Sequence, residues 1–155
     1  METAFGKRLD RVRQASPLVH CISNLVTAND CANIVLAAGA SPIMADAPEE
    51  VREITALSRA LCLSLGTPNP RKADAMFLAG RKAAELGLPV VFDPVGVGAS
   101  AYRQEIARKL LRDIPLTVLR CNASELQTLS GQSLVSRGVD AGKAPELETL
   151  LPLAE

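Results

Sequence analysis

The sequence predicts an α/β fold: a parallel sheet covered by helices on both faces. Short apolar segments alternate with amphipathic segments five times along the 155 residues. Most apolar segments lack the polar–apolar alternation of half-exposed strands, which favours a sheet that is buried on both faces. A chain of this length can bury one core, so we expect a single domain over residues 1–155.

The first helix has an apolar side formed by Phe5, Leu9 and Val12. A strand follows at Leu18–Ile22. Thr27 then stands where an N-cap is expected, with Asp30 as its capping-box partner. Gly39 ends this second helix. Its predicted buried face comprises Cys31, Ile34, Val35 and Ala38.

The second strand is predicted at Pro42–Ala45, and Asp46 is the expected N-cap of the third helix. The buried residues of that helix are predicted to be Val51, Ile54 and Leu57. The third strand is LCLSLG, residues 61–66, and Asn69 with Pro70 then forms a cap and a first-turn proline.

The fourth helix ends at Gly87, and LPVVFDPV, residues 88–95, is the fourth strand. Ser100 begins the fifth helix, whose apolar positions are Tyr102, Ile106, Leu110 and Leu111. The fifth strand is predicted at 115–121, and NASELQTLSG opens a sixth helix. The segment 145–155 reads as a further helix.

Composition excludes several classes of protein. Lysine plus arginine and aspartate plus glutamate are both 17, so the net charge is zero and nothing favours binding to nucleic acid. No apolar run is long enough for a signal peptide or a membrane span. The four cysteines form no CxxC pair, which favours reduced thiols in the cytoplasm.

Ligands bind beyond the carboxyl ends of the strands in open parallel sheets. Asp93 lies at one of these ends and is followed by Gly96 and Gly98, a pattern typical of a phosphate or metal site. The alternative is a turn that simply needs glycine. Arg120, at the end of the fifth strand, is either a salt-bridge residue at the sheet rim or a ligand of phosphate oxygens.

Asn122 and Glu125 have the spacing of a capping box, but Glu125 could equally order a water on magnesium. Met44 ends the second strand, where a methionine is more often core filler. His20, the only histidine, is more often a satisfied core residue than a catalytic one. Nothing in the sequence indicates a lowered pKa for Cys21 or Cys121.

Several longer motifs resemble the hydroxyethylthiazole kinase family. They are PLVHCISN, AAGASPIMADAPEEV, LSLGT, AMFLAGRKAAELGLPVVFDPVGVGASAYR and TVLRCNASEL, in order between about residues 17 and 140. The resemblance implies a ribokinase-like fold, of which this chain is the N-terminal portion. It also implies phosphorylation of 4-methyl-5-(2-hydroxyethyl)thiazole with ATP and Mg²⁺, by a homotrimer that shares its substrate site between subunits.

The resemblance assigns roles to particular positions. Met44, Asn24 and the Gly66–Thr67 turn would bind the thiazole. The residues that would bind ATP are Arg120, Asp93 and Asn122, and the residues that would hold the metal are Glu125 and Asp93.

The chain departs from the family pattern in two places. Cys21 stands where the family usually has asparagine, and no Gly-Thr-Gly-Cys segment occurs. That segment would supply the donors for the charge that develops in phosphoryl transfer, so no catalytic residue is assigned. We therefore expect a truncated chain that is weak or inactive alone and whose open strand edge favours association.

Two other functions stay open at this point. One is another ribokinase-like enzyme, such as a hydroxymethylpyrimidine kinase or an NAD(P)H-hydrate dehydratase. The other is a non-catalytic subunit that binds the thiazole or serves assembly.

Overall fold

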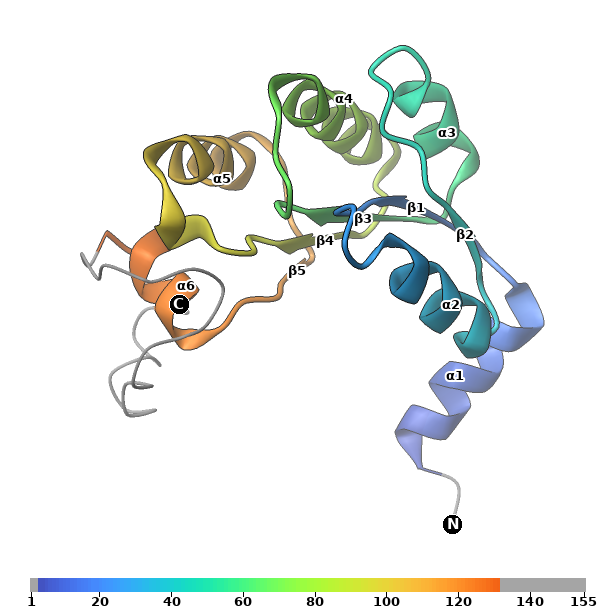
Figure 1. Cartoon of the computed structure of the whole chain (residues 1–155). Helices are drawn as coiled ribbons and strands as arrows, with labels where there is room; N and C mark the ends of the chain where they lie inside the picture. The colour runs from blue at the N-terminus through green and yellow to red at the C-terminus, as the bar shows by residue number, and fades with distance from the viewer. Residues whose placement is uncertain (1–2, 132–155) are drawn as a thin grey trace.

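The computed structural model of the chain describes residues 3–131, so the helix expected at 145–155 lies outside the described part. Helices and strands alternate as predicted, which confirms the α/β fold (Figure 1). The elements are α1 (Ala4–Ala15), β1 (Leu18–Ile22), α2 (Ala28–Ala38), β2 (Ser41–Ile43), α3 (Val51–Leu57), β3 (Ala60–Ser64), α4 (Pro70–Leu86), β4 (Val90–Asp93), η1 (Val97–Ala99), α5 (Ala101–Asp113), β5 (Val118–Leu119) and α6 (Ala123–Leu129).

The five described strands form one parallel sheet with the order β2-β1-β3-β4-β5. In this register Cys21 lies opposite Cys62, and Ser64 lies opposite Asp93. The strand order changes direction between β1 and β3. Figure 1 shows the consequence, because α2 leaves β1 on one face of the sheet and α4 leaves β3 on the other. Such a switch point opens a crevice at the carboxyl edge of the sheet.

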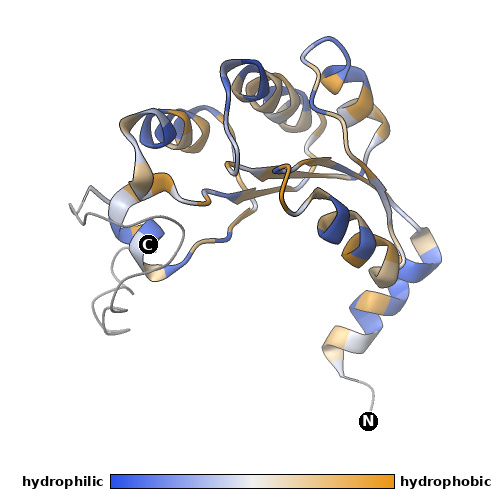
Figure 2. Ribbon diagram, viewed as in Figure 1, coloured by the Kyte–Doolittle hydropathy of each residue, from blue (hydrophilic) through white to orange (hydrophobic). Residues whose placement is uncertain are grey.

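The core lies between the sheet and the layer formed by α3, α4 and α5 (Figure 1). Leu61, Leu63, Val90 and Phe92 point into this layer and are fully buried. Figure 2 shows that apolar residues follow the strands and continue onto α2.

The opposite face of the sheet carries α2, with α1 packed against α2, while α6 packs against η1 and α5 at the end of the sheet. Cys62, Ser64, Val91 and Asp93 lie on this face and are only half-buried, so β3 and β4 alternate in burial. The sequence shows little alternation because several residues on the more open face are themselves apolar.

Several predicted boundaries are confirmed. Asn69 accepts a hydrogen bond from the Lys72 amide at 2.9 Å, and Ser100 accepts one from the Arg103 amide. Gly39 and Gly87 end their helices with positive φ, a conformation that glycine adopts without strain.

Other predictions about the helices are wrong. Thr27 makes no side-chain cap, because its backbone is not extended and its hydroxyl accepts the Asn24 Nδ2 instead. Asp46 does not cap α3, which begins at Val51 after a turn over residues 48–50.

The predicted apolar faces are also only partly correct. Ile34 is 68% exposed, and Leu57 and Phe5 lie in solvent as well. α3 buries Val51 and Thr55 instead, and none of the residues of α1 and α2 is fully buried. α1 packs mainly against α2 among the described residues, so its apolar periodicity has little to pack against there.

β1 has the predicted bounds, and the other four described strands are shorter than predicted. β5 contains only Val118 and Leu119, and β2 ends at Ile43, so Met44 lies just beyond its strand. Among the described residues, no helix combines the length and hydropathy that a membrane crossing requires.

Candidate functional site

A cavity of about 210 Å³ opens at the carboxyl edge of the sheet, beside the switch point, between the ends of β1 and β2. The loop after β1 forms one wall and the loop after β2 forms the other. The lining residues are Cys21, Ser23, Asn24, Leu25, Ala28, Met44 and Asp46. Met44 is 40% exposed, so it is not core filler in the described structure. The structure therefore brings Met44 and Asn24, two of the predicted substrate residues, into one cavity.

Asn24 shapes this cavity through its own hydrogen bonds. Its Oδ1 accepts the backbone amides of Val26 at 3.0 Å and Thr27 at 2.9 Å. Its Nδ2 donates to the hydroxyls of Thr27 at 2.8 Å and Ser64 at 3.5 Å. Asn24 thus folds the β1–α2 loop and ties it to β3.

The Gly66–Thr67 turn supports Asn24 from the next strand. A Cβ atom on Gly66 would lie 2.5 Å from the Asn24 Cβ, so this approach requires glycine. The Thr67 hydroxyl accepts the Leu25 amide at 3.2 Å, and Thr67 has φ of 46°. Gly66 and Thr67 therefore hold the loop that lines the cavity.

A second hollow of about 250 Å³ continues along the same edge of the sheet toward β5. Asn24 lies at one end of it, and Asp93 and Arg120 lie at the other. The remaining walls include Cys21, Cys31, Cys62 and Ser64. The predicted substrate residues and the predicted nucleotide residues thus share one continuous edge.

Asp93 and Arg120 form an ion pair at this far end. The Arg120 Nη1 donates to Asp93 Oδ2 at 2.8 Å, while the Arg120 side chain remains 74% exposed. The other carboxylate oxygen, Asp93 Oδ1, is buried and has no hydrogen-bond partner among the described residues. A buried oxygen without a partner is unfavourable unless a ligand completes it.

Glu125 is buried and both of its carboxylate oxygens accept backbone amides. Oε2 accepts from Asn122 at 2.9 Å and completes the predicted capping box. Oε1 accepts from Gly96 at 3.0 Å, which ties the loop after β4 to the start of α6. The capping interpretation is therefore confirmed, and the metal role of Glu125 stays a prediction.

Two cationic side chains at this edge escaped the sequence analysis. Lys72 of α4 is 4% exposed and donates its ammonium group to the carbonyls of Ser23 and Gly66. Arg103 of α5 donates to the carbonyls of Leu65 at 3.0 Å and Val95 at 2.8 Å. One signal was available for Lys72, because a lysine in the first turn of a helix opposes the helix dipole.

His20 is the satisfied core residue that the sequence favoured. It is fully buried, its Nε2 lies 2.8 Å from the Ala45 carbonyl, and its Nδ1 lies 2.9 Å from the Thr55 hydroxyl. With its proton on Nε2 the neutral ring donates to the Ala45 carbonyl, and the single Thr55 hydroxyl proton is shared between Nδ1 and the Val51 carbonyl at 2.6 Å. Burial lowers the pKa of His20, which keeps the ring neutral.

All four cysteines are free thiols, as predicted, but only Cys21 is fully buried. A hydrogen bond with Cys62, and then burial, raise the pKa of the Cys21 thiol. Burial also raises the pKa of Cys121. Neither thiol has the lowered pKa of a reactive nucleophile, in agreement with the sequence analysis.

Comparison with known proteins identifies the family. The model of the hydroxyethylthiazole kinase family matches residues 9–154. The chain belongs to the hydroxyethylthiazole kinase family. Hydroxyethylthiazole kinase of Desulfovibrio desulfuricans is 52% identical over 139 residues, which cover 90% of this chain and 49% of that protein.

Other members of the family show the same relation. The kinase of Methanoculleus marisnigri is 53% identical over 134 residues, which cover 86% of this chain and 48% of that protein. The solved hydroxyethylthiazole kinase of Pyrococcus horikoshii is 41% identical, with a TM-score of 0.78 over 81% of this chain and 49% of that chain. The chain thus spans about half the length of the relatives it matches.

Membership of a kinase family implies that ATP is the phosphoryl donor, and proteins commonly bind ATP together with Mg²⁺. Asp93 fits such a metal, because one of its oxygens is buried and unpaired, and Mg²⁺ is often held by one or two carboxylates together with waters and phosphates. The described residues contain no cluster of three or more metal-ligating side chains.

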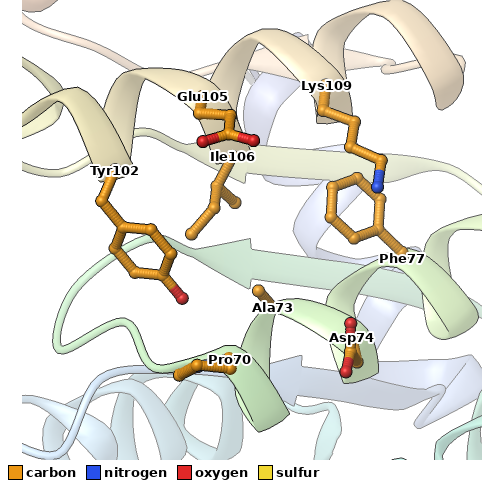
Figure 3. Close-up of a pocket in the computed structure, with 8 residues that line it drawn as sticks. All are labelled: Pro70, Ala73, Asp74, Phe77, Tyr102, Glu105, Ile106 and Lys109. Carbon is orange, nitrogen blue, oxygen red and sulfur yellow. The ribbon is translucent and has the colours of Figure 1, made fainter.

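A further cavity, of about 220 Å³, lies between α4 and α5 (Figure 3). Its walls include Phe77 and Tyr102, and the Lys109 ammonium lies 4.5 Å from the centre of the Phe77 ring. None of the predicted site residues lines this cavity. We assign it no part in the site.

Proposed function

We propose that the protein phosphorylates the primary alcohol of 4-methyl-5-(2-hydroxyethyl)thiazole with ATP. One observation carries this proposal: the Met44 and Asn24 cavity and the Asp93–Arg120 pair lie along one edge of the sheet. Such an arrangement suits a reaction that must place an alcohol beside a phosphoryl group. Membership of the family favours the thiazole alcohol over the substrates of other ribokinase-like enzymes.

Residues at one end of this edge would bind the thiazole, and residues at the other end would bind the nucleotide. Met44 and the loop held by Asn24, Gly66 and Thr67 bind the apolar heterocycle. Arg120 binds phosphate oxygens, because its guanidinium is exposed and already oriented by Asp93. Asn122 holds the neighbouring helix start in place.

Magnesium, when bound with ATP, would neutralise phosphate charge. Asp93 would hold the ion through its unpaired oxygen, and Glu125 would orient a water on it through a remaining lone pair. These residues would position the phosphate groups and compensate their negative charge. Positioning and charge stabilisation account for most of the catalysis of phosphoryl transfer by proteins. The described residues supply no candidate that we assign as catalytic base.

A trimer with a shared substrate site is part of the proposal. Large apolar side chains next to the Met44 cavity are exposed, and a neighbouring subunit would cover them. They are Leu25, which lines the cavity, and its neighbour Val26. The reduced cysteines are consistent with the cytoplasm, which stays a prediction.

Titration of the folded full chain with the thiazole alcohol tests the proposal, followed by an assay of ATP-dependent phosphorylation with Mg²⁺. We expect binding of the thiazole and little or no turnover by these 155 residues, which contain no Gly-Thr-Gly-Cys segment. A folded chain that does not bind the thiazole contradicts the substrate assignment. Rapid turnover supports the function and overturns only the expectation of weak activity.

A further inference from the structure

Lys72 and Arg103 occupy equivalent places at the carboxyl edge of the sheet. Each side chain comes from the helix that follows a strand and donates to backbone carbonyls on two neighbouring strands or their loops. Lys72 joins the loops after β1 and β3 through Ser23 and Gly66. Arg103 joins the end of β3 to the loop after β4 through Leu65 and Val95.

The position of Lys72 is unfavourable in two respects. Burial removes the ammonium group from water, and the first turn of α4 is the positive end of the helix dipole. The carbonyls of Ser23 and Gly66 offset this penalty, and the charge of Asp46 acts in the same direction. A lysine here is therefore explained by the contacts of its head group and not by the stability of the helix.

The place that Lys72 bridges is the switch point of the sheet. α2 and α4 leave β1 and β3 on opposite faces, so no helix packing holds these two loops together (Figure 1). The same loops carry Asn24 and the Gly66–Thr67 turn. The loop after β1 forms one wall of the proposed substrate cavity, so its attachment to the loop after β3 determines where that wall stands.

Arg103 continues the connection toward the nucleotide end. Val95 belongs to the loop between Asp93 and Gly96, and Gly96 is held in turn by Glu125. Charged side chains thus link the loops after β1, β3 and β4 and the start of α6.

We propose that Lys72 and Arg103 are positioning residues, which hold the substrate end and the nucleotide end of the site at the spacing that phosphoryl transfer requires. This inference rests on the proposed function. Neither residue touches the reacting atoms in this account. Both act through the loops whose carbonyls they bind.

Hydrogen exchange of the full chain without ligand tests directly whether Lys72 and Arg103 hold these loops. Lys72→Met keeps the length of the side chain and removes the ammonium, so amide exchange should rise about tenfold or more in residues 24–27 and stay unchanged in residues 95–98. Arg103→Met should give the reverse pattern. The matched controls are Arg71→Met and Arg108→Met, which change exposed cations on the same helices and should alter neither loop.

Amides of β1 and β3 report global unfolding and serve as the reference. Lys72→Arg should partly restore protection, and it replaces Lys72→Met if that variant does not fold. Exchange in both loops that equals wild type in all of these variants overturns the proposal.

Ligand affinities test the positioning role separately from hydrogen exchange. Lys72→Met should weaken binding of the thiazole alcohol about tenfold and binding of ATP less than about twofold, because only the first ligand contacts the β1 loop. Unchanged thiazole affinity despite faster loop exchange overturns the positioning role. If wild type binds no thiazole, the proposed function and the positioning role fail together. The exchange pattern then still shows whether Lys72 and Arg103 hold the loops.

Discussion

At the scale of single residues, the close approach of Gly66 to the Asn24 side chain shapes the loop that lines the cavity. Asn24 uses all its polar groups to fold its own loop, so it has no room to move aside. The loop geometry therefore depends on a missing side chain as much as on the side chains present.

Gly66→Ala should displace Asn24, because the added Cβ would lie 2.5 Å from the Asn24 Cβ. We expect a loss of about 1–3 kcal/mol in the free energy of unfolding and at least tenfold weaker thiazole binding. Chemical denaturation and calorimetric titration measure the two effects. Gly6→Ala, where the new methyl group meets only ordinary contacts, is the control and should stay close to wild type.

His20 should make stability depend on pH. Its pKa is lowered in the folded state, so between the unfolded value near 6.5 and the lower folded value the unfolded chain binds more protons. The free energy of unfolding should therefore fall as the pH decreases from 7 to 5. Chemical denaturation at a series of pH values measures this free energy. It should change less with pH in His20→Gln than in wild type, and an equal pH dependence in both proteins would contradict the role of His20.

At the scale of elements, the helix caps differ in how far sequence predicts them. Asn69, Ser100 and Asn122 cap as their spacing indicates, because each stands directly before its helix. Thr27 does not, because its backbone lacks the extended conformation of an N-cap and its hydroxyl accepts the Asn24 Nδ2 at 2.8 Å. A local rule fails where another polar side chain engages the expected capping group.

Asn69→Ala should destabilise α4 by about 1 kcal/mol, because the Lys72 amide loses its partner. α4 carries much of the core, so the loss should appear in the global free energy of unfolding, measured by urea denaturation. Asn33→Ala, in an exposed position within α2, is the matched control. A loss of equal size in the control would show that capping is not the cause.

At the scale of the whole molecule, apolar side chains that the described residues leave open gather near the substrate cavity. Leu25 and Val26 stand at the mouth of the β1–α2 loop, and Ile34 and Leu36 lie on the adjacent helix. Exposed apolar side chains such as Leu25 and Val26 beside a cavity are typical of an interface.

We therefore expect the full chain to associate in solution. Leu25→Ser combined with Val26→Ser should shift sedimentation toward the monomer without loss of secondary structure, since both side chains are exposed and lie outside the helices. Leu86→Ser, at an exposed position at the far end of α4, is the control. A chain that is monomeric at high concentration would contradict the shared-site proposal.

The order of elements and the identity of the ligand edge could be predicted from sequence, because both follow from local periodicity and from the parallel topology. Asp93, Arg120 and Glu125 were recognisable as polar residues at strand ends. Lys72 and Arg103 were not, because their partners are carbonyls of residues that are distant in sequence. Every residue has a backbone carbonyl, so no sequence pattern shows which carbonyls will accept a hydrogen bond from a distant side chain.

The sequence by itself therefore determined the fold class, the family motifs and most helix boundaries, because these depend on short-range patterns of apolar and capping residues. The tertiary structure decided which strand ends meet, how closely Gly66 approaches Asn24 and which cations join the loops. It also decided that Ile34 and Phe5 lie in solvent. Burial depends on what packs against a helix face, and that partner lies elsewhere in the chain or in another subunit.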